Sequence, residues 1–161
     1  MEWNNAERTE LRDRVLRWVK TQGVAMCEEP EALDRLKVLY EVVYTVFSDV
    51  IQETGLCAVF AYRMSEQPEK YYGSDSVCWR DMTSDVGALF AIGVSVEVLE
   101  CDSAEYMALC ILHELAHVLA PDLKVEHGAV YHAILDGLIE RFNDETGFCV
   151  QNDYEGMDVS G

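Results

Sequence analysis

One apolar segment that carries two histidines and a glutamate constrains this chain more than any other feature. Residues 108–120 read ALCILHELAHVLA, in which His113, Glu114 and His117 are the polar side chains. Burying such groups costs free energy unless they are paired or bind a metal ion. The segment therefore predicts a buried helix whose polar residues have a function.

The spacing of these three residues points to metal chemistry. His113 and His117 are four residues apart, so they share one face of a helix. Two imidazoles on one face are typical of a zinc site. Glu114 lies about 100° around the helix from His113, where it can flank the metal and take a proton from a zinc-bound water. Although His-Glu-x-x-His also arises by chance on charged helices, we interpret it here as two zinc ligands and one catalytic base.

A third ligand must come from further along the chain. Pro121 breaks the helix, so the chain can fold back and bring His127 to the metal. Glu126 is an adjacent alternative, and Glu140, which opens a Glu-x-x-x-Asp pattern, is our second choice after His127. His132 lies about 140° around a helix from His127, so the two are not expected to bind the same ion.

Apolar periodicity predicts four helices and two strands around this segment. Pro30 precedes the second helix, Asp102 and Ser103 provide cap chemistry for the third, and Gly147 lies just past the end of the fourth. The polar stretch 64–86 is expected to be a loop or irregular insertion, and 152–161 a loosely held tail. The expected helices are 6–20, 31–53, about 102–120 and 127–143, and the expected strands are 56–62 and 88–98.

Length and composition fit one α+β domain spanning residues 1–161. The chain has 161 residues, half of them hydrophobic, which is enough for a core at this size. The expected arrangement has long N-terminal helices, a short sheet, and an active-site helix followed by a second metal-binding helix.

The charge excludes several functions. With 12 Lys+Arg against 30 Asp+Glu, the formal net charge is −18. Such an acidic protein is not expected to bind nucleic acid directly or to sit on anionic membranes. The sequence has no signal-peptide pattern and no long apolar run, so we predict a cytoplasmic protein without a membrane span. Its six cysteines include no Cys-x-x-Cys pair and are interpreted as reduced thiols, with Cys78 the one candidate for a metal-switch thiolate.

Several ordered motifs resemble the SprT-like zinc metallopeptidases, the group that includes the Spartan protease. The resemblance covers about residues 33–154. The motifs that match are Ile92-Gly93-Val94-Ser95 with Leu99, the sequence Ile111 to His117, His127-Gly128-x-x-Tyr131, and Asn143-x-x-Thr146-Gly147.

This resemblance implies a zincin-like domain with Zn²⁺ held by His113, His117 and His127 and with Glu114 as general base. It also implies hydrolysis of peptide bonds in a protein or peptide substrate. The chain departs from the family in its longer 64–86 stretch, in lacking a Cys-rich zinc ribbon, and in its charge, so a DNA-linked role is not expected. Residues 1–30 are an N-terminal helical extension and 148–161 a tail.

Three functions follow as hypotheses. The first is a zinc-dependent metalloendopeptidase, a hydrolase whose substrate pairs with an exposed edge of strand 89–96. The second is a zinc-stabilised protein-binding module with little turnover. The third is a latent peptidase blocked by its own tail or its 64–86 loop. Tyr131 is expected to pack against the site, and Asp136 or Asp122 could orient a ligand imidazole; the oligomeric state is left open.

Overall fold

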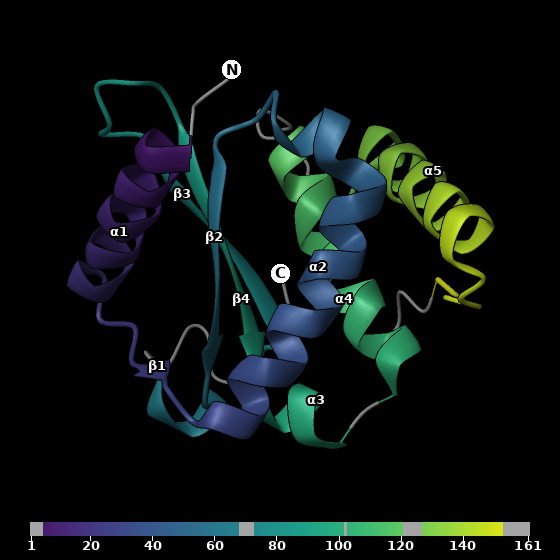
Figure 1. Cartoon of the computed structure of the whole chain (residues 1–161), viewed down its shortest axis with the longest axis horizontal. Coiled ribbons are helices and arrows are strands. Elements are labelled where there is room, and N and C mark those ends of the chain that lie inside the picture. Colours follow the sequence, from purple (N-terminus) through teal and green to yellow (C-terminus); the bar gives the residue numbers. More distant parts are fainter. Residues whose placement is uncertain (1–4, 68–72, 102, 121–126, 153–161) are drawn as a thin grey trace.

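The structure is a computed structural model, and it describes residues 5–67, 73–101, 103–120 and 127–152. Within these residues it is an α+β fold built around one four-stranded sheet. Helix α1 (Asn5–Thr21) covers one face of the sheet. Helices α2 (Pro30–Ile51), α4 (Ala104–Leu119) and α5 (Ala129–Thr146) lie on the other face (Figure 1). The predicted α+β class is confirmed.

The sheet has the order β1-β2-β4-β3. Its strands are β1 (Met26–Cys27), β2 (Leu56–Tyr62), β3 (Ser76–Asp81) and β4 (Leu89–Ser95). Strands β2 and β4 are parallel, whereas β3 pairs with β4, and β1 with β2, in the antiparallel sense. All seven residues of β4 are buried, because helices cover both faces of this central strand.

Two predictions about this region were wrong. The 64–86 stretch is not simply a loop, since it contains a short 3-10 helix (Met64–Glu66) and the whole of β3. Pairing with β4 stabilises this short strand, and the local sequence does not reveal that pairing. The strand predicted over 89–96 has no exposed edge, because β4 is paired on both sides; the edge strands of the described sheet are β1 and β3.

The helix ends follow local cap chemistry with small differences from prediction. Ser103 Oγ accepts a hydrogen bond from the backbone N–H of Tyr106 at 3.1 Å, which starts α4. The strand predicted to reach residue 98 ends at Ser95, where helix α3 (Val96–Cys101) begins. The Ser95 hydroxyl accepts a 3.2 Å hydrogen bond from the N–H of Val98. This local cap lies within a run of apolar residues whose pattern predicts a strand.

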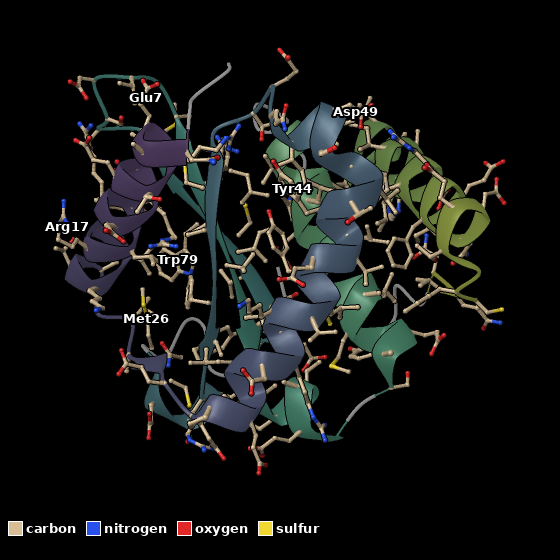
Figure 2. The ribbon with its side chains drawn as sticks, in the orientation of Figure 1. Glu7, Arg17, Met26, Tyr44, Asp49 and Trp79 are labelled. Carbon is tan, nitrogen blue, oxygen red and sulfur yellow. The ribbon has the colours of Figure 1, made fainter. Side chains whose placement is uncertain are left out.

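The sheet separates two apolar clusters. On the α1 side, Leu11, Val15 and Val19 pack against β-strand residues. Trp18 meets Trp79, which is labelled in Figure 2, edge to face at a centroid distance of 6.3 Å. On the other side, α2, α4 and α5 form the larger cluster with the inner face of β2 and β4. This larger cluster holds α4, and therefore the His-Glu-x-x-His segment, against the sheet.

The chain after α5 turns back along that helix. Gly147 has φ +79°, the left-handed conformation that ends helices at glycine. The Asn143 side chain then makes two 2.9 Å hydrogen bonds with the backbone of Val150, and Asn152 donates to Asp136 at 2.8 Å. Residues 148–152 are thus held against α5, whereas 153–161 lie outside the described residues.

In the described part of the chain, no helix has the length and apolar character needed to cross a membrane.

Candidate metal centre

Three histidines from two parts of the chain meet at one point. His113 and His117 lie on α4, and His127 lies two residues before α5. One ring nitrogen from each lies within 4.8 Å of the others. The Nε2 atoms of His117 and His127 are 3.1 Å apart, and the ring centroids of the three pairs are separated by 5.2, 4.9 and 5.0 Å. The structure therefore brings together the three residues that the sequence predicted as ligands.

An unusual backbone conformation positions the third histidine. His127 has φ +58° and is the one non-glycine residue in the described chain with a positive φ. Residues other than glycine pay a steric cost in this region. The next residue, Gly128, is extended and serves as the N-cap of α5, so the helix begins at Ala129 rather than at the predicted residue 127. The strain falls on the residue whose side chain completes the cluster, which is where functional strain is expected.

The buried His113 side chain fits a metal ligand. It has no exposed surface, and neither of its ring nitrogens has a hydrogen-bond partner among the described residues. Burial lowers the pKa of His113 from 6.5 to about 3, with smaller contributions from His117 and His127. The imidazole is therefore neutral at pH 7 and has a lone pair available for a metal. Buried polar atoms without partners are rare in proteins, and a bound ion would satisfy one of these nitrogens.

The Tyr131 ring packs against all three histidines of the cluster. Its ring centroid lies 5.5 Å from that of His113, 4.6 Å from that of His117 and 4.9 Å from that of His127. Its hydroxyl donates a 2.8 Å hydrogen bond to the backbone carbonyl of His113. The predicted packing role of Tyr131 is confirmed, and the contact links α5 to α4 at the cluster.

Glu114 is held by a residue that sequence reasoning missed. Its side chain is fully buried, with Oε2 3.9 Å from His113 Nε2. The Ser76 hydroxyl on β3 donates a 2.6 Å hydrogen bond to this same Oε2. Ser76 was overlooked because it lies in the stretch interpreted as a loop. Its signal was the β-prone sequence SVCWRD that it opens.

The other candidate residues do not join the cluster. Glu140 is exposed and lines a surface hollow of about 350 Å³ with neighbours on its own helix. The ring centroid of His132 lies 5.8 Å from that of Tyr131. Neither His132 nor Cys78 belongs to the group of described residues that could share an ion. The Asp136 carboxylate accepts from Asn152. The remaining alternatives, Glu126 and Asp122, lie outside the described residues.

The donor set itself is selective. Imidazoles suit zinc, copper, iron and nickel, whereas Ca²⁺ and Mg²⁺ take oxygen ligands. A set of three protein ligands is the pattern of catalytic zinc sites, which keep a fourth position open.

In comparisons with known proteins, no family model and no curated protein matches the chain.

Proposed function

We propose that this chain is a zinc-dependent metalloendopeptidase with a zincin-like arrangement of its catalytic residues. The observation that carries the proposal is the meeting of His113, His117 and His127, with a buried glutamate next to the first of them. The motif resemblance to SprT-like peptidases, drawn from the sequence, supports the same assignment.

Each residue of the centre has a role in this proposal. The three histidines hold the zinc ion, which when bound supplies a Lewis acid that polarises the substrate carbonyl and acidifies water. Glu114 accepts the proton of the attacking water and passes it to the leaving amine. Ser76 fixes the orientation of the Glu114 carboxylate through its 2.6 Å hydrogen bond, and Tyr131 holds the imidazoles in place.

The edge strand β3 is the proposed site of substrate pairing. In the described chain, β3 is the last strand of the sheet and pairs only with β4, so its other edge has no partner strand. An extended peptide can add to such an edge through main-chain hydrogen bonds. Because Ser76 begins β3 and contacts Glu114, a peptide on this edge would lie next to the catalytic base.

Two measurements on the purified full chain test the proposal. Elemental analysis should find one zinc per chain, and His117→Ala should lose it. With casein as substrate, Glu114→Gln should abolish cleavage while zinc content stays the same. A wild-type chain that neither contains nor takes up zinc would refute the metal assignment. Zinc retention without any cleavage by wild type would favour the protein-binding module instead.

A further inference from the structure

The outer edge of β2 lies in a groove between α1 and α2, and β4 separates β2 from β3, the strand whose Ser76 contacts Glu114. Strand β1 pairs with Tyr62 and Ala61 alone, so Leu56–Phe60 have a described partner strand on the β4 side only. Figure 1 shows β2 running between α1 and α2 with its edge toward the viewer. The pairing of β2 with β4 shifts register between Leu56 and Ala58, so the regular part of this edge is Ala58–Phe60. A regular edge presents every second backbone N–H and C=O group to a further strand.

Side chains turn this edge into a defined groove of about 440 Å³. Cys57, Ala58 and Val59 of β2 form its floor, and α2 contributes an apolar wall. Cys57 and Val59 alternate with buried residues and are themselves only half buried, so their side chains are accessible to a ligand. The α2 residues of the apolar wall are Leu33, Leu36 and Tyr40.

The rim of the groove carries both cations and carboxylates, with a small excess of cations, whereas the whole molecule has a net charge of −18. Arg12 from α1 and Lys37 from α2 are both exposed and line the groove. The charge of Arg8 also acts there, since it lowers the pKa values of Tyr40 and Cys57 against the rise that burial causes. Glu41 lines the groove as well, and Asp13 lies 3.4 Å from Arg12, so the cations are only partly balanced.

We propose that this groove docks an extended segment of a partner protein, with alternating apolar side chains and an acidic residue, as an added strand on β2. The exposed strand edge supplies main-chain hydrogen bonds, the apolar floor and wall take the apolar side chains, and Arg12 and Lys37 meet the acidic residue. A second copy of this chain is a poorer occupant, because pairing β2 with β2 would bring Arg12 and Lys37 of one copy close to the same cations of the other.

The docking groove is independent of the proposed peptidase activity. In the sheet order β1-β2-β4-β3, the groove lies at the β2 edge and Ser76 lies on β3 at the opposite edge. A partner held on β2 therefore leaves the metal centre uncovered. Its binding is measured without zinc chemistry, so failure of either proposal leaves the other standing.

Fluorescence anisotropy on the full chain tests the docking proposal. The probe is a labelled hexapeptide of alternating valine and threonine in which one central threonine is replaced by aspartate. A second peptide carries lysine at that position, and a third has N-methyl groups on alternate amides. The variants are Arg12→Glu and Lys37→Glu. The matched control is Arg17→Glu, which reverses a charge on the side of α1 that faces away from β2 (Figure 2).

The expected result is saturable binding of the aspartate peptide that weakens about tenfold or more in either groove variant and stays unchanged in Arg17→Glu. The lysine and N-methyl peptides should bind at least about tenfold more weakly. No binding of the aspartate peptide up to about 1 mM, the weak end of measurable affinity, would overturn the proposal. So would equal weakening by Arg17→Glu. A further contradicting result is self-association of Arg12→Glu or Lys37→Glu in sedimentation without loss of peptide binding. It would show that these two cations only prevent β2 from pairing with β2 of another copy.

Discussion

The Ser76 hydroxyl donates a 2.6 Å hydrogen bond to Glu114, and this contact joins the edge strand β3 to helix α4. The residues just before Ser76 are fixed in turn. Tyr62 donates to the carbonyl of Ser74 at 2.6 Å, and the Tyr106 hydroxyl bonds to Asp75. The position of the Glu114 carboxylate therefore depends on a strand about forty residues earlier in the sequence, and on two tyrosines that hold the start of that strand.

Replacing Ser76 by alanine should lower kcat for casein cleavage by about tenfold and leave KM and zinc content unchanged, since one hydrogen bond to a charged group is lost. Steady-state kinetics and elemental analysis measure these quantities. Ser74→Ala is the control, because Ser74 is a neighbouring buried serine whose backbone carbonyl, not its side chain, accepts the hydrogen bond from Tyr62. An equal loss of kcat in both variants would mean that Ser76 acts only through the stability of β3.

Replacing His127 by asparagine should weaken zinc binding by more than about 100-fold, since even the loss of a group that merely orients a ligand costs about 10–100-fold. Asparagine tolerates the left-handed conformation of this position, so the fold should be retained. Competition with a chromogenic chelator measures the affinity, and circular dichroism checks the fold. His132→Ala should change zinc affinity little. The opposite order of effects, or loss of zinc in Glu140→Ala, would move the third ligand elsewhere.

Truncation of the C-terminal segment should have two different effects. Ending the chain after Asn152 keeps the contacts of Val150 and Asn152 with α5, so it should lower the free energy of unfolding less than the shorter truncation does. Ending it after Gly147 should lower that free energy by about 3 kcal/mol, because Val150 is buried and Phe148 packs edge to face on Phe142. Urea denaturation measures both. A rise in casein cleavage after removal of residues 153–161 would support the latent form of the enzyme.

The isolated protein should not bind single- or double-stranded DNA at physiological salt, and DNA should not activate cleavage. Affinity for DNA requires clustered basic residues that displace counterions. Helix α1 has the densest set of basic residues in the described chain. It also contains Glu7, Glu10 and Asp13, and Arg14 pairs with Asp85. Anisotropy titrations at low and physiological salt measure this. Micromolar binding that weakens steeply with salt would show that a local basic surface outweighs the net charge. The basic residues of α1 are Arg8, Arg12, Arg14, Arg17 and Lys20.

Features that depend on neighbours in sequence were predictable from the sequence alone. Apolar side chains at helical spacing gave the positions of α1, α2, α4 and α5 to within a few residues. The four-residue separation of His113 and His117 determined that they share a helix face, because helix geometry is fixed by the backbone. Pro30 and Gly147 marked helix ends for the same local reason.

Only the tertiary structure decided the features that depend on pairing across the chain. The strand β3 exists because β4 offers it hydrogen bonds, and that pairing brings Ser76 to Glu114. The order β1-β2-β4-β3 placed the strand that was expected to be an edge inside the sheet. It put β3 at one edge, and at the other the two-residue β1 covers only Ala61 and Tyr62 of β2. Sequence spacing named His127 as a ligand candidate, but its meeting with His117 rests on a left-handed backbone and on the packing of α5 against α4. Local propensity contains no information about such contacts, because their free energy comes from partners distant in sequence.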